Sequence, residues 1–224
     1  IMETIFERIA YCVEVGKINA ATPYPPTMKG EDGADELTAA ALAEGYSPNE
    51  VLTEGLIAGM NRTGVKFKEN KVFVPQVLMS AKAMSSGMNH LKKYFADGSV
   101  KRKGKFIVGT VQGDLHDIGK NLVCMMVEGN GYEVIDLGVD VSKETFVEAV
   151  RKNPDAFVGM SALLTTTMVN MGPINEAIKA EFPKVKTFVG GAPVNGDFAQ
   201  KIGVDYYTEE PQKLVEILNR LAAN

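Results

Sequence analysis

The sequence contains no tryptophan and only two cysteines and two histidines among its 224 residues. The cysteines, Cys12 and Cys124, lie far apart within apolar, helix-compatible stretches. So few cysteines exclude a disulfide-based scaffold and leave little material for a thiolate metal site. Free buried thiols in a reducing cytoplasm are predicted in preference to a disulfide or a metal-binding pair.

Neither a strong charge of one sign nor a long apolar run is present. Lysine and arginine number 24 against 28 acidic residues, so the net charge of -4 provides no basic field for nucleic acid. No apolar run approaches the roughly 18 residues of a membrane-spanning helix, and no charged-then-apolar leader opens the sequence. We therefore expect a cytoplasmic protein with no nucleic-acid or membrane partner, long enough for two small domains.

The first part of the chain has the periodicity of helices. Ile5, Ile9, Cys12 and Val13 fall on one helical face, and Ser47-Pro48-Asn49-Glu50 is a capping box with proline at the first helical position. The predicted helices cover residues 3–17, 35–44, 48 to a break around Gly64, and 75–95. The proline-rich and glycine-rich stretch 19–34 is predicted to be a surface excursion or a loop that contacts a partner. Residues 1–96 are thus expected to form a four-helix bundle.

The second part alternates between strand and helix. A polar, glycine-punctuated segment, 97–104, is the expected linker. The predicted strands are 105–111, 132–137, 156–160, 185–189 and 205–208, and the helices between and after them are 118–129, 142–152, 168–182, 197–202 and 211–222. Five βα units predict an α/β fold, a flavodoxin-like five-stranded parallel doubly wound sheet, over residues 105–224.

Three loops follow the carboxyl ends of the first, third and fourth predicted strands. They cover residues 113–120, 161–167 and 190–195. In a flavodoxin-like order these strands are neighbours, so the loops should meet at one crevice. The loops contain Asp-x-His, four hydroxyl residues and a double glycine, which suggests a metal-ligating imidazole, hydrogen-bond donors and a close approach to backbone.

The spacing Asp114-x-His116 lets both side chains of an extended segment project the same way. A carboxylate that accepts the proton of one imidazole nitrogen raises the basicity of the other nitrogen, as a metal ligand requires. One histidine cannot hold a bare ion, so any metal must arrive inside a cofactor that supplies most of its ligands. Taken alone, a histidine at a strand end is more often an ordinary loop residue.

Together the three loops resemble the corrinoid (vitamin B12) binding signature. Its elements are Asp114, His116 and Gly119, then Ser161 and Leu163, then Gly190 and Gly191. The helical part resembles the cap module of cobalamin-dependent methionine synthase and of the corrinoid proteins in methanol, methylamine and aryl methyl ether methyltransferase systems. The resemblance covers nearly the whole chain.

The resemblance implies a corrinoid cofactor of the methylcobalamin or cob(I)alamin type, with its cobalt held by His116. Asp114 would support His116, and Thr167 would close the hydrogen-bond relay. Ser161 and Leu163 would line the slot for the cofactor's nucleotide tail, and three glycines would give it room. Phe67 and Val74 of the cap would cover the upper, methyl-bearing face. The full set of expected cofactor-binding residues is Asp114, His116, Asp117, Ile118, Gly119, Ser161, Leu163, Thr165, Thr167, Gly190, Gly191, Phe67 and Val74.

The function implied is that of a methyl carrier, a subunit with no catalysis of its own. It would accept a methyl group on Co(I) from a one-carbon substrate and pass it to tetrahydrofolate or a thiol. The implied partners are a substrate:corrinoid methyltransferase, a methylcorrinoid:tetrahydrofolate or thiol methyltransferase, and a reductive activating protein. The alternative is a B12-dependent sensor or regulator, although such sensors resemble this arrangement with an added DNA-binding module and a cap tryptophan. A carbon-skeleton mutase needs a substrate barrel for which 224 residues have no room.

Two expectations remain outside the signature. The proline-rich segment 19–34 resembles the aryl methyl ether carriers, so an O-demethylase system is the first expected methyl source, ahead of methanol or methylamine. Glu128, Asp136 and Asp140 are taken as surface charges, and His90 as a surface or packing residue.

Overall fold

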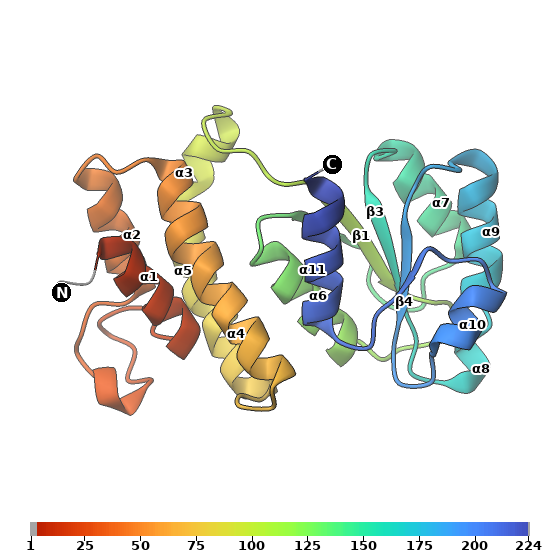
Figure 1. Cartoon of the computed structure of the whole chain (residues 1–224), viewed down its shortest axis with the longest axis horizontal. Helices are drawn as coiled ribbons and strands as arrows, with labels where there is room; N and C mark the ends of the chain where they lie inside the picture. Colours follow the sequence, from red (N-terminus) through yellow and green to blue (C-terminus); the bar gives the residue numbers. More distant parts are fainter. Residues whose placement is uncertain (1–3, 224) are drawn as a thin grey trace. The chain divides into compact units, whose positions relative to one another are not determined.

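The computed structural model describes residues 4–223, which fold into two compact units (Figure 1). The first contains residues up to Arg102 together with the short segment Gly129–Gly131, and the second contains the rest. Within the described residues, no helix has the length and apolar character needed to cross a bilayer.

The first unit is helical, as predicted. Its helices are α1 (Ile5–Val15), α2 (Ala34–Ala43), a third that runs without interruption through α3 (Pro48–Glu50), a π-helical segment (Val51–Ile57) and α4 (Ala58–Lys68), and α5 (Val74–Ala96). Ser47 caps the third helix by accepting a hydrogen bond from the Glu50 backbone. The apolar faces meet in a core that includes Ile9, Val13, Leu56, Met60 and Leu91. Four helical stretches therefore bury the faces that their periodicity predicts.

The predicted helix break around Gly64 is wrong. Gly64 is buried within α4, and the helix continues to Lys68 before Asn70 turns the chain with a φ of 57°. One glycine in a helix costs only about 1 kcal/mol relative to alanine. Packing of α4 against α1 and α5 compensates for that cost.

The segment 19–34 is an irregular excursion that contains one short 3-10 helix, Pro26–Met28. Both ends are fixed by buried or partly buried polar groups. The Lys17 ammonium donates to the Thr22 carbonyl at 2.8 Å, and the Glu36 carboxylate accepts from the backbone of Ala20 and Gly33. The loop is therefore anchored at its base, while a contact with a partner stays a prediction.

Both cysteines are free thiols, as the sequence predicts, although only Cys12 is fully buried and Cys124 is partly buried. Burial raises the pKa of Cys12 to about 11 and that of Cys124 to about 12. Thiols with such pKa values hold almost no thiolate at neutral pH, so they behave as apolar packing groups.

The second unit is a parallel sheet in the order β2-β1-β3-β4-β5, which confirms the predicted flavodoxin-like order. Its strands are β1 (Lys105–Thr110), β2 (Glu133–Asp136), β3 (Phe157–Ser161), β4 (Thr187–Gly190) and β5 (Tyr206–Tyr207). Its helices are α6 (Ile118–Glu128), α7 (Lys143–Lys152), α8 (Thr165–Met168), α9 (Met171–Glu181), α10 (Gly196–Lys201) and α11 (Pro211–Ala222). The helix expected over 168–182 corresponds to α9, which begins at Met171 and has Pro173 in its first turn as predicted, whereas the short helix α8 before it was not predicted.

Helices cover both faces of this sheet (Figure 1). α7 and α9 pack together on one face, and α6 and α11 pack together on the other. The register aligns Thr110 of β1 with Ser161 of β3, and Ser161 with Gly190 of β4. Three neighbouring strands therefore end at the same level, and the loops that follow them start side by side.

Phe188 is expected to contribute strongly to the stability of this unit. It is fully buried in β4, with its ring stacked on Tyr206 and edge-on to Phe106 and Phe157. Phe188→Ala should lower the free energy of unfolding by about 3–5 kcal/mol, because it removes buried area and leaves a cavity. Urea unfolding followed by circular dichroism would measure the change, with Phe188→Leu as a milder control. A loss below about 1 kcal/mol for the alanine variant would contradict the prediction.

Candidate functional site

The candidate site is organised by Asp114, in the loop that follows β1. Its side chain is completely buried. One carboxylate oxygen, Oδ1, accepts from His116 Nδ1 at 2.7 Å and from the His116 backbone at 3.1 Å. The other, Oδ2, accepts from the Thr167 hydroxyl at 2.6 Å and from the Leu163 backbone at 2.8 Å. Asp114 thus joins the β1–α6 loop to the β3–α8 loop.

These donors decide the charge state of Asp114. Burial by itself would raise the pKa of the carboxyl group. The hydrogen bonds from Thr167, from the Leu163 backbone and from His116 outweigh burial and hold the pKa of Asp114 well below its usual range. The carboxylate therefore stays ionised at neutral pH.

The His116 ring, unlike the Asp114 carboxylate, is accessible to solvent. Its side chain is 51% exposed, although the carboxylate that it contacts is inaccessible. Because Nδ1 donates its proton to Asp114, the lone pair of the neutral ring lies on Nε2. The Thr110 hydroxyl also donates to the His116 carbonyl, at 2.9 Å. The loop is therefore fixed while one basic nitrogen remains available to a ligand.

The remaining predicted residues of the three loops occupy less constrained positions. Ser161 ends β3, and its carbonyl accepts from the Val111 backbone at 3.0 Å. Thr165 begins α8 and is exposed. Asp117 and Ile118 are exposed at the start of α6, where Asp117 accepts from the Asn121 amide. The structure brings His116, Leu163 and Thr167 into contact with Asp114. The other predicted residues only border this group; they are Ser161, Thr165, Asp117 and Ile118.

The three glycines of the expected cofactor-binding set differ in the space around their α-carbons. Gly191 has a φ of 125°, and a Cβ there would lie 1.9 Å from the Ala162 carbonyl oxygen. Gly190 is tight against the Thr208 carbonyl, whereas a Cβ on Gly119 would meet nothing within 4 Å. Gly191 is therefore required by a close approach between two backbones, and Gly119 borders open space that a ligand could use.

Phe67 and Val74 lie in the helical unit, near the end of α4 and at the start of α5. Both are partly buried, and the neighbouring Val65 and Phe73 are exposed. That they cover a cofactor stays a prediction.

Asp136 and Asp140 are exposed, as expected of surface charges, but each also accepts a hydrogen bond that the sequence did not predict. Asp140 Oδ1 accepts from the Gly113 backbone at 2.7 Å, and Asp136 Oδ2 accepts from the buried Lys120 ammonium at 2.6 Å. Asp140 thus holds the start of the Asp114–His116 loop, whereas Asp136 pairs with Lys120 of α6. Their place at the end of a strand beside β1 is the signal that could have revealed them.

The surroundings of His116 suit a metal that arrives with its own ligands. No group of three or more His, Cys, Asp or Glu residues lies close enough to hold an ion in the part of the chain that the structure describes. The loops do expose large apolar side chains, which are Leu115, Ile118, Leu163, Leu164 and Val169. Exposed apolar groups around one basic nitrogen fit a large, partly apolar cofactor better than a hydrated ion.

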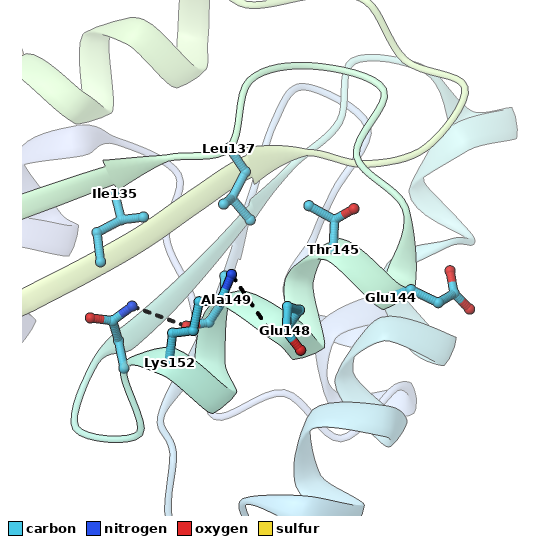
Figure 2. Close-up of a pocket in the computed structure, with 8 residues that line it drawn as sticks. Ile135, Leu137, Glu144, Thr145, Glu148, Ala149 and Lys152 are labelled. Atoms are coloured by element: carbon cyan, nitrogen blue, oxygen red, sulfur yellow. Dashed lines mark hydrogen bonds and ion pairs between the residues drawn. The ribbon is translucent and has the colours of Figure 1, made fainter.

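A separate pocket lies between β2 and α7 (Figure 2). Its volume is about 450 Å³, and Ile135 and Leu137 face Thr145 and Ala149 across it. None of the residues predicted from the three loops lines it. It is therefore distinct from the Asp114–His116 site.

Comparison with known proteins decides the family. A family model described as a B12 binding domain matches residues 104–217, and a second model with the same description matches residues 30–92. The chain belongs to the B12-binding family. This B12-binding chain is 41% identical to trimethylamine corrinoid protein 1 of Methanosarcina acetivorans, over 83% of this chain and 88% of the relative. It is also 41% identical to dimethylamine corrinoid protein 1 of the same organism, over 84% and 90%.

Solved structures agree with this membership. The methanol:cobalamin methyltransferase complex from Methanosarcina barkeri matches with a TM-score of 0.82 and 31% identity, over 98% of this chain and 80% of that chain. A cobalamin-binding protein from Desulfitobacterium hafniense matches with a TM-score of 0.71 and 30% identity, over 83% and 89%. The cofactor of this B12-binding chain is a corrinoid, and the exposed imidazole, the apolar loops and the space beside Gly119 fit such a group.

The Thr167 hydroxyl should measurably stabilise the fold. Thr167→Val keeps the shape but leaves a buried carboxylate without one of its donors, so we expect a loss of about 1.5–3 kcal/mol at pH 7 and a higher pKa for Asp114. Thr167→Ser keeps the hydroxyl and should stay within about 1 kcal/mol of the wild type. Urea unfolding of the cofactor-free protein measures the stability of both variants. Equal stability of the valine and serine variants would contradict the role of this hydrogen bond.

Proposed function

We propose that this chain is the corrinoid-binding methyl carrier of a multi-component methyltransferase. The observation that carries the proposal is the Thr167–Asp114–His116 relay, which joins a buried ionised carboxylate to an exposed imidazole. When bound, the corrinoid supplies a cobalt that can carry a methyl group. We assign the chemistry of methyl donation to partner proteins.

Each site residue has a proposed task. His116 binds the cobalt through Nε2, and Asp114 holds the tautomer and the orientation of the ring. Thr167 and the Leu163 backbone keep Asp114 ionised and in place. Ser161, Leu163, Thr165, Asp117, Ile118 and the glycines border the remainder of the cofactor.

The proposed domain organisation follows the sequence. Residues 1–96 form a cap that includes Phe67 and Val74, residues 97–104 form a linker, and residues 105–224 bind the corrinoid. The two family models, which match 30–92 and 104–217, support this division.

A methylated amine is the methyl donor that the relatives favour. Two relatives that are 41% identical over more than four fifths of this chain are named as trimethylamine and dimethylamine corrinoid proteins, whereas the methanol complex is 31% identical. The aryl methyl ether source expected from segment 19–34 has no support of this kind. We propose a substrate:corrinoid methyltransferase specific for a methylamine as the donor partner. A tetrahydrofolate or thiol methyltransferase and a reductive activating protein complete the proposed system.

Replacement of the metal ligand tests the site. His116→Ala should still bind the corrinoid through the remaining contacts, but the absorbance spectrum should change to that of cobalt without a protein nitrogen ligand. His90→Ala is the matched control, because His90 is the other histidine and pairs with Asp35 in the helical unit. Its spectrum should equal that of the wild type. An unchanged spectrum for His116→Ala would refute the assignment.

A donor panel tests the methyl source. The loaded and reduced protein is mixed with purified methyltransferases for trimethylamine, dimethylamine, methanol and an aryl methyl ether, each with its substrate. A change in cofactor absorbance is expected with the trimethylamine or the dimethylamine methyltransferase and its substrate, since each partner must fit the surface of its own carrier. No change is expected with the methanol or the aryl methyl ether methyltransferase. Methyl transfer only from methanol, or only from the aryl methyl ether, would contradict the proposal of a methylamine donor.

A further inference from the structure

The loop between β2 and α7 holds the His116 loop from the side opposite to Thr167. Asp140 in this loop has a φ of 52°, a left-handed conformation that only glycine, asparagine and aspartate adopt at low cost. From this position its backbone N–H donates to the Asp114 carbonyl at 2.9 Å, while its Oδ1 accepts from the Gly113 backbone at 2.7 Å. One residue therefore binds the Gly113–Asp114 segment twice.

The loop that holds Asp140 is itself fixed to β1. Thr110 donates to the Gly138 carbonyl and accepts from the Val141 backbone, both at 3.0 Å. Asp136 accepts from the Gly138 backbone at 2.8 Å and from buried Lys120. These hydrogen bonds therefore hold the backbone of the loop that carries Asp140.

The contacts of Asp140 complement those of Thr167 and Leu163. Thr167 and Leu163 hold the Asp114 carboxylate, and Thr110 holds the His116 carbonyl, but neither contact holds the Gly113 N–H or the Asp114 carbonyl. Asp140 holds the backbone on both sides of the Asp114 nitrogen and α-carbon. With the carboxylate and the backbone both fixed, the imidazole two residues later keeps one orientation.

We propose that Asp140 is a positioning residue for the metal ligand: its paired hydrogen bonds to Gly113 and Asp114 preorganise His116 for coordination of the corrinoid cobalt. This inference rests on the proposed function of His116. It assigns to the β2–α7 loop a role that its exposed charges do not suggest.

Two variants separate the hydrogen bond from the backbone conformation. Asp140→Gly keeps the left-handed backbone and its N–H but removes the side-chain acceptor. Asp140→Asn keeps both the conformation and the acceptor and removes only the charge. The matched control is Asn70→Gly, because Asn70 is the other described non-glycine residue with a positive φ and lies in the helical unit.

The readout is the equilibrium between nitrogen-ligated and unligated cobalt, taken from the absorbance spectrum of the corrinoid-loaded protein. For Asp140→Gly we expect the ligation constant to fall by roughly three- to tenfold, as for loss of one partly exposed charge-assisted hydrogen bond. Asp140→Asn and Asn70→Gly should stay within about twofold of the wild type. In the cofactor-free protein, hydrogen exchange of residues 111–117 should be faster in Asp140→Gly and unchanged in Asn70→Gly.

A wild-type ligation constant and wild-type exchange in Asp140→Gly would overturn the positioning role. His116→Ala is measured in parallel to separate this failure from that of the proposed function. If His116→Ala shows the wild-type spectrum, His116 is not the ligand, and both proposals fall together. If His116→Ala loses the ligand and Asp140→Gly does not, only the role of Asp140 is refuted.

Discussion

The structure of this site depends on one buried carboxylate. Asp114 has no accessible surface, and an ionised group in that position is tolerated only when its oxygens are fully hydrogen-bonded. Its donors come from its own loop and from the loop after β3. The same contacts that stabilise the charge therefore also join the two loops and orient His116. Stability and site geometry have a common origin in this interaction.

The order of the strands makes this interaction possible. β1 and β3 are neighbours although a strand and two helices separate them in the chain, and their last residues, Thr110 and Ser161, are paired. The loops that follow start a few ångströms apart at the carboxyl edge, where open α/β sheets bind ligands. The third loop joins them because Gly191 lacks the Cβ that would collide with the Ala162 carbonyl. The strand order places the three loops near one another, and the missing side chain at Gly191 allows two of their backbones to come into close contact.

The division of labour between protein and cofactor follows from the residues available. One imidazole is presented to solvent, and the described part of the chain offers no cluster of other metal-binding side chains. A corrinoid would bring the metal with most of its ligands, so the proposed coordination needs only one nitrogen from the protein, that of His116. The proposed carrier would leave substrate selection to its partners, so the proposal of a methylamine donor rests on the relatives and not on the site.

Local pattern in the sequence determined much of this protein: the apolar periodicity of the helices, the five βα units, and the Asp114-x-His116 pair that places a carboxylate beside an imidazole. Strand order, and with it the meeting of Asp114, Leu163 and Thr167, followed from the fold class. The tertiary structure alone decided the hydrogen-bond partners of Asp136 and Asp140, because a charged residue in a polar loop has the same local pattern whether it faces water or a neighbouring backbone. It also decided that α4 continues through Gly64, since packing against α1 and α5 outweighs the weak helix preference of one glycine. Periodicity determines which face of an element is buried, but a contact between two loops depends on their conformations, such as the left-handed turn at Asp140.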